Sequence, residues 1–222
     1  MMLENRKRLT IALILNLLIL MFELYAFSMN FFVGNDRFDF FELQFYTHLS
    51  NIFMLFSSLM SSLEITKEFC GAVERVHRGV RRISYISTCC LTLTFVIVVS
   101  VLAPMEGSDG AKFLLFGSTN IFEHIICPIL AFVTLVFFGD FGDLRSIDAF
   151  YAVIPTLLYA VVMIVLNVIG VVDGPYPFLR VREQHLVDSV LWFILLGAVV
   201  FGIAELLLFL TRTFNVSRKY FK

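Results

Sequence analysis

Six long runs of apolar residues constrain the fold of this 222-residue chain more than any other feature. Each run is close to the roughly 20 residues that an α-helix needs to cross the hydrocarbon core of a bilayer. Because a bilayer offers no water to unpaired backbone groups, such runs are expected to be helical. The expected spans are residues 9–29, 42–63, 83–104, 119–138, 149–171 and 186–211. The sequence therefore predicts an all-α, polytopic membrane protein whose residues 1–222 form a single six-helix transmembrane domain.

The composition supports a membrane class and excludes others. Hydrophobic residues make up 59% of the chain and charged residues 16%, whereas soluble domains have about 45–50% and about 25%. A net charge of −1, with no basic stripe carrying interleaved aromatics, argues against a nucleic-acid partner. No cofactor motif is present, and none of the four cysteines has the spacing of a zinc or disulfide framework. The expected partners are the bilayer and a lipid.

The distribution of Lys and Arg predicts the orientation. Short polar connectors separate the runs, among them residues 34–36, 106–110, 139–140 and 173–175. Of the 17 basic residues, 13 fall in the two tails and in the second and fourth connectors, and 4 fall in the others. Because cytoplasmic loops carry an excess of Lys and Arg, both termini are expected in the cytoplasm of a cell-membrane protein. The first run is too long for a cleaved signal peptide, so it is expected to be an uncleaved span.

Polar residues inside the expected spans gather near the outer surface. In this orientation, spans two, four and six enter from the outside, and each places polar residues at spacings of three, four and seven, on one helical face. The stripes are Gln44, Thr47, His48 and Asn51; Asn120, Glu123, His124 and Cys127; and Asp188, Ser189 and Trp192. Glu23 and Asn167 lie near the outer ends of spans one and five, with Tyr159 two turns deeper than Asn167. The pattern predicts one outward-facing polar pocket, closed below by an apolar inner half.

Each of these residues also has an ordinary structural role. A membrane-embedded Thr commonly bonds back to its own helix, which would explain Thr47. Histidine and asparagine join helices, and carboxylates near a helix end are solvated at the headgroups. Tyr176 and Trp192 suit an aromatic belt at the interface. The convergence of three stripes at one depth favours a functional pocket over these separate explanations.

Thr47 and His124 predict nucleophilic catalysis. A hydroxyl is a weak nucleophile at neutral pH and needs an adjacent base, for which histidine is suited. Glu123 or Asp188 would orient the imidazole, and Asn51 or Asn167 would donate to a developing oxyanion. The pattern thus predicts an intramembrane lipid hydrolase or acyl-transfer enzyme, with His48, Tyr159 and Glu23 as further pocket residues.

Two other functions remain open from the residues alone. His48, His124, Glu123 and Asp188 are ligand types that suit Zn²⁺, which would give a metal-dependent intramembrane hydrolase, although no H-E-x-x-H spacing is present. A binding or transport protein for a lipid or a small polar ligand would use the same pocket without turnover. The lack of a detectable repeat makes a secondary transporter the weaker form of that alternative.

Four short segments carry a family resemblance. They are Phe45-Tyr46-Thr47-His48-Leu49-Ser50-Asn51, His124-Ile125-Ile126-Cys127-Pro128, Pro155-Thr156-Leu157-Leu158-Tyr159 and Gly174-Pro175-Tyr176-Pro177-Phe178-Leu179. In order, spacing and span count the chain resembles the six-span androgen-induced and androgen-dependent membrane hydrolases, which cleave fatty acid esters of hydroxy fatty acids. It looks closer still to a related bacterial family of six-span membrane proteins. The resemblance implies that Thr47 is the nucleophile and His124 its base.

Overall fold

A computed structural model describes residues 2–33, 37–139 and 143–220, and this part of the chain is almost entirely helical. The α-helices are α1 (Met2–Phe31), α2 (Tyr46–Phe69), α3 (Arg78–Ile97), α4 (Ala103–Met105), α5 (Gly107–Phe116), α6 (Cys127–Val133), α7 (Ser146–Val168) and α8 (Leu186–Tyr220). Two 3₁₀ turns, η1 (Phe40–Gln44) and η5 (Pro177–Leu179), and three π-helical segments, η2 (Val98–Leu102), η3 (Phe122–Ile126) and η4 (Thr134–Phe138), complete the helical part. A hairpin pairs β1 (Phe32–Val33) with β2 (Arg37–Phe38) in antiparallel fashion. The connector expected at 34–36, Asp140 of the one at 139–140 and the basic residue Lys222 lie outside the described residues.

Five helices in the described residues are long and apolar enough to cross a membrane, which confirms an all-α, multi-pass membrane protein. Their mean hydropathy lies between 1.2 and 2.7. They are Glu4–Phe31, Tyr46–Phe69, Arg78–Met105, Ser146–Val168 and Leu186–Phe214. A shorter apolar helical stretch, Phe122–Phe138, corresponds to the expected fourth span.

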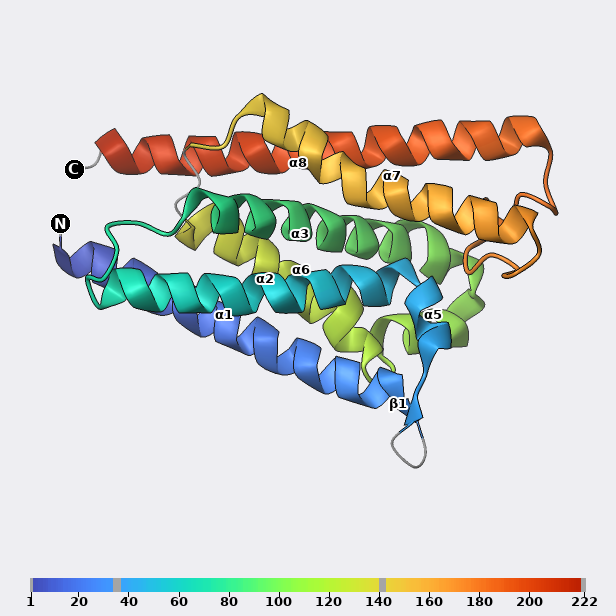
Figure 1. The fold of residues 1–222 in the computed structure, drawn as a ribbon, viewed down its shortest axis with the longest axis horizontal. Helices are drawn as coiled ribbons and strands as arrows, with labels where there is room; N and C mark the ends of the chain where they lie inside the picture. The colour runs from blue at the N-terminus through green and yellow to red at the C-terminus, as the bar shows by residue number, and fades with distance from the viewer. Residues whose placement is uncertain (1, 34–36, 140–142, 221–222) are drawn as a thin grey trace.

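Helix α3 lies at the centre of the bundle, where it contacts α2, α6, α7 and α8 (Figure 1). On one side α1 packs against α2 and α6, and on the other α7 packs against α8. The two chain ends lie at the same end of the bundle, here called the terminal end (Figure 1). The β1–β2 hairpin, α5 and the connection between α7 and α8 lie at the opposite end, here called the hairpin end.

Two local structures at the hairpin end differ from the sequence expectation. The second span was expected from residue 42, but α2 begins at Tyr46, because Asp39 caps the separate turn η1 by accepting a 2.9 Å hydrogen bond from the Phe41 amide. Gln44 therefore does not belong to the polar face of α2. Residues 106–110 were expected to be a connector, yet Gly107, with φ of +71°, turns the chain and starts helix α5.

The packing toward the terminal end is less apolar than expected. An apolar cluster does join α3, η4, α7 and α8, and the Tyr85 hydroxyl donates a 2.6 Å hydrogen bond to the Ala204 carbonyl within it. However, α2 also buries a stripe of small polar residues, Ser57, Ser58, Ser61 and Ser62. Small residues let membrane helices approach closely. The expectation of an apolar inner half is therefore incomplete, because the serines supply close packing there.

Candidate functional site

Thr47 lies in the first turn of α2 and is buried, with 8% of its surface exposed. Its amide donates to the Tyr176 hydroxyl oxygen over 3.4 Å, and its own hydroxyl lies 3.5 Å from the same oxygen. The first amides of a helix have no partner within that helix, so Tyr176 satisfies one of them. No hydrogen bond from the Thr47 hydroxyl back to its own helix occurs among the described residues, since the extended Phe45 interrupts the helical path one residue before α2 begins. The ordinary role for a membrane threonine is thus not the one that Thr47 adopts.

Tyr176 belongs to this site, although the sequence predicted it at the membrane interface. Instead of forming an aromatic belt, it is buried, stacks on Phe178 at 5.3 Å between ring centroids and meets Phe45 edge-on at 6.5 Å. Burial raises the pKa of the Tyr176 phenol above its usual value, so the hydroxyl keeps its proton and can donate it. Gly174, with φ of +89°, makes the turn that directs Tyr176 inward. Pro175 and Pro177, which flank this tyrosine, were the sequence signal for its burial, because they indicate a fixed turn rather than a mobile loop.

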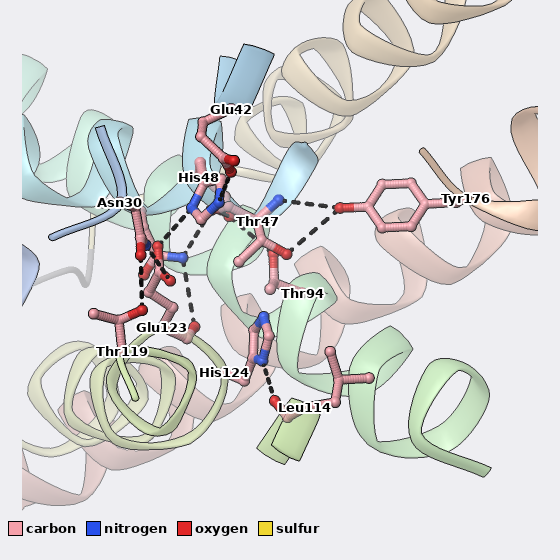
Figure 2. A network of polar contacts seen from close by, with 12 residues as sticks. Asn30, Glu42, Thr47, His48, Thr94, Leu114, Thr119, Glu123, His124 and Tyr176 are labelled. Carbon is pink, nitrogen blue, oxygen red and sulfur yellow. Dashed lines mark hydrogen bonds and ion pairs between the residues drawn. The ribbon is translucent and has the colours of Figure 1, made fainter. Parts of the chain in front are cut away.

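His124 belongs to the π-helix η3 and is buried, with 4% of its surface exposed. Its Nδ1 lies 2.6 Å from the Leu114 carbonyl oxygen of α5. A carbonyl only accepts, so Nδ1 carries the hydrogen and Nε2 of the neutral ring is left with a free lone pair. Figure 2 shows the ring edge opposite Leu114 directed toward Thr47 and Thr94. No hydrogen bond joins the Thr47 and His124 side chains among the described residues.

His48 follows Thr47 in sequence but belongs to a separate polar network (Figure 2). Its Nδ1 and Nε2 lie 2.8 Å from carboxylate oxygens of Glu123 and Glu42, respectively. A ring that donates from both nitrogens is the protonated imidazolium. The other Glu123 oxygen accepts a 2.8 Å bond from Asn30, whose carbonyl oxygen accepts from Thr119 over 2.8 Å. The network ties α1, η1, α2 and the start of η3 together, so His48 acts here as a structural cation.

The π-helix η3 separates the two adjacent residues Glu123 and His124. Single turns of π-helix occur within α-helices frequently at functional sites, because the wider turn redirects side chains. Here Glu123 faces the His48 network while His124 bonds to α5. Glu123 therefore does not orient the His124 ring. The Leu114 carbonyl orients it instead.

Asn51 and Asn167, two other predicted pocket residues, are both hydrogen-bonded to backbone groups. Asn51 uses its amide hydrogens on the Thr47 and Glu123 carbonyls, at 2.7 and 3.4 Å, so they are not free for an oxyanion. Asn167 closes the turn after α7 by bonding the Val172 carbonyl and the Arg182 amide. 

Three further predicted residues form no hydrogen bond with Thr47 or His124 among the described residues. Glu23 is buried at 2% exposure, and its Oε1 has no hydrogen-bond partner among the described residues. Asp188 is exposed, so the structure does not bring it into the cluster. Tyr159 donates a 2.6 Å hydrogen bond to the Gln44 carbonyl and reaches a cavity beside Thr47.

This cavity has a volume of about 40 Å³ and runs between α2, α3, α7 and α8. Its polar wall consists of Tyr46, Thr47, Thr94, Thr156, Tyr159 and Tyr176, and the rest is apolar. A water molecule needs roughly 10–15 Å³ on this measure, so the cavity has room for a few waters. His124 is not part of its wall and faces Thr47 from the η3 side.

The described residues do not supply a metal centre of the predicted composition. No group of three or more His, Cys, Asp or Glu side chains in residues 2–33, 37–139 and 143–220 is placed to hold a metal ion. Both nitrogens of His48 already face carboxylates, and Asp188 is exposed. The predicted set of His48, His124, Glu123 and Asp188 therefore does not form one coordination sphere.

Together these features define a multi-pass helical membrane protein with a buried polar cluster at one end of the bundle. No protein-family model matches the sequence, and no curated protein and no solved structure matches it either.

Proposed function

We propose that the chain crosses the cell membrane six times, with both termini in the cytoplasm and the hairpin end outside. Two observations support this topology: the 13-to-4 division of basic residues and the location of both chain ends at one end of the bundle. The sixth crossing would be Phe122–Phe138. Its 17 residues reach the lower limit of about 17 for a transmembrane helix.

We further propose that the protein is an intramembrane lipid hydrolase or acyl-transfer enzyme, with Thr47 as nucleophile and His124 as general base. The observation that carries this proposal is the 2.6 Å contact between His124 Nδ1 and the Leu114 carbonyl. It holds the ring in the tautomer whose Nε2 can accept a proton, and that edge is directed toward Thr47. A base whose other nitrogen is held by a third group is the arrangement that activates a weak hydroxyl nucleophile.

In this reaction, the Thr47 oxygen bonds to the carbonyl carbon of an acyl ester as its proton passes to His124 Nε2. The carbonyl π electrons move to oxygen, giving a tetrahedral oxyanion. When the oxyanion collapses, the bond to the leaving alcohol breaks and His124 returns the proton to that alcohol. Water, or an acceptor alcohol in the transfer reaction, then attacks the acyl-threonine by the same two steps, which regenerates Thr47.

The surroundings of Thr47 favour a developing negative charge. Thr47 lies at the amino end of α2, where the helix dipole is positive and the first amides lack helical partners. The Tyr176 hydroxyl, 3.5 Å from the Thr47 oxygen, is a neutral donor beside the same point. These groups replace Asn51 and Asn167 as the proposed oxyanion donors.

The substrate class follows from the apolar cavity walls and from the membrane setting, and the resemblance to hydrolases of fatty-acyl esters agrees with both. A second candidate is a non-enzymatic binding protein for a lipid or small polar ligand. The small, mostly apolar cavity and the missing hydrogen bond between Thr47 and His124 favour this alternative.

An activity-based fluorophosphonate probe tests the proposal, because it forms a covalent adduct only with an activated hydroxyl. Purified wild type should acquire one adduct, which mass spectrometry should locate on Thr47. Thr47→Ala should remove the adduct, and Thr156→Ala, at a second threonine of the same cavity wall, should retain it. Equal labelling of wild type and Thr47→Ala would end the Thr47 assignment. A bound lipid without any adduct or turnover would favour the binding protein.

A further inference from the structure

A second and larger hollow opens on the side of the bundle, between η1 and α7. Its volume is about 520 Å³, and Phe40, Phe41, Gln44, Leu158, Tyr159 and Val162 form much of its wall. Phe40, Leu158 and Val162 expose 74%, 62% and 46% of their surfaces. They belong to, or lie beside, a membrane-length helix with a mean hydropathy of 2.4. The hollow is therefore an apolar groove at the perimeter of the bundle, where the bilayer surrounds the protein.

The bilayer determines which molecule fills such a groove. An empty hollow in a hydrocarbon medium forfeits dispersion contacts along its walls, and an acyl chain restores them. A volume of 520 Å³ falls in the range of about 300–1,000 Å³ typical of ligand sites. The described walls offer no charged side chain to a head group. The groove thus suits the acyl chain of a membrane lipid rather than its polar part.

Tyr159 separates this groove from the cavity beside Thr47, and it is the residue that lines both. Its hydroxyl donates a 2.6 Å hydrogen bond to the Gln44 carbonyl of η1, and its ring meets Tyr46 edge-on at 5.1 Å. Pro155 lies one turn earlier in α7. Because proline has no amide hydrogen, the Tyr151 carbonyl lacks its helical partner there, which weakens the turn of α7 that precedes Tyr159.

We infer that the groove between η1 and α7 binds one lipid acyl chain and that Tyr159 is the gate between this chain and Thr47. Breaking the bond from Tyr159 to Gln44 lets the ring turn and joins the groove to the cavity. The ester carbon at the head of the chain then reaches Thr47 while the tail stays in the groove. The inference of acyl-chain binding does not depend on the proposed function, whereas the gate rests on it.

The binding step is tested with the full chain in nanodiscs of phosphatidylcholine that carries a diazirine in one acyl chain. After irradiation, mass spectrometry should find adducts on residues 155–166 of α7. Val162→Trp, which fills the groove, should lower their yield about tenfold, as expected when several methylene contacts are lost. Val161→Trp is the matched control, because Val161 is equally exposed at 47% but does not line the groove. Equal yields from the two variants would overturn the acyl-chain site.

The gate is tested by comparing the rates at which hexadecyl and ethyl fluorophosphonates label Thr47. Val162→Trp should lower the ratio of the hexadecyl rate to the ethyl rate about tenfold. Tyr159→Phe, which removes the bond to Gln44, should accelerate the hexadecyl probe several-fold, and an unchanged rate would overturn the gate. If neither probe labels wild type while the photochemical result holds, the proposed function fails and the acyl-chain site stands. If Thr47 is labelled but Val161→Trp and Val162→Trp cross-link equally, the acyl-chain site fails and the proposed function stands.

Discussion

His48 and His124 lie near the same end of the bundle, yet their surroundings differ in one decisive respect. His48 has a carboxylate 2.8 Å from each ring nitrogen, so its hydrogen-bonding capacity is used. His124 has one nitrogen fixed by the Leu114 carbonyl and the other without a hydrogen-bond partner among the described residues. A fully satisfied ring contributes to the fold, whereas a half-satisfied ring has capacity left for a substrate. The comparison explains why the two histidines are assigned different roles.

The largest expected effect comes from removing the half-satisfied ring. His124→Ala should slow labelling of Thr47 by the fluorophosphonate probe about 100- to 10,000-fold, the usual contribution of a general base. His185→Ala, at an exposed histidine before α8, should leave the rate unchanged. A His124→Ala protein labelled at the wild-type rate would remove the distinction between the two histidines.

Removing the carboxylate that holds the satisfied ring should act on stability instead. Glu123→Ala leaves His48 and Asn30 without their buried partner. We expect the free energy of unfolding in detergent to fall by about 3–5 kcal/mol, as for other broken buried ion pairs. Asp188→Ala, at an exposed carboxylate, should not change it. Equal melting curves for these two variants would contradict a structural role of the His48 network.

Tyr176→Phe tests the hydrogen-bond donor beside the proposed nucleophile, Thr47. The substitution keeps the stacked ring but removes the hydroxyl 3.5 Å from the Thr47 oxygen. The labelling rate of Thr47 should fall about 100-fold, at the lower end of the effect of losing one oxyanion donor. Tyr25→Phe, at an exposed tyrosine of α1, is the control. An unaltered rate would leave the α2 amides as the remaining candidate donors.

The smallest effect is expected at the outer partner of His48. The Glu42 side chain is 26% exposed, against 3% for Glu123. Because water screens an exposed ion pair, Glu42→Ala should lower the free energy of unfolding by less than about 1 kcal/mol. The same thermal unfolding measurement applies, and a loss as large as that of Glu123→Ala would show that both carboxylates hold the ring equally.

The long helices were predictable because their sequence signal is local and repeated. Each apolar run of about 20 residues carries its own reason to be helical in a bilayer, so α1, α3, α7 and α8 each cover most of an expected span, although their ends differ by up to nine residues. The elements at the hairpin end were not predictable, since short turns depend on individual contacts. Gln44 was expected on the face of α2, yet the Asp39 cap and the extended Phe45 separate η1 from that helix.

Four residues of the candidate site were predictable from the sequence, but their pairing was not. Helical spacing brought Thr47, His48, Glu123 and His124 to one depth, and all four lie near the hairpin end. Spacing cannot show that Glu123 bonds His48 rather than His124, because the wide turn of η3 changes the direction of side chains within one helix. The orienting group is a backbone carbonyl in α5, which leaves no trace in residue type.

The sequence alone determined the membrane class, the helical content and most of the polar residues on the long helices, since hydropathy and helical period act within each segment. Tertiary structure decided which of these residues contact one another. Tyr176 reaches Thr47 from 129 residues away in the chain, and Leu114 holds His124 from a helix that was expected to begin as a connector. Such contacts depend on how the segments pack, and packing is a property of the whole chain rather than of any one of its runs.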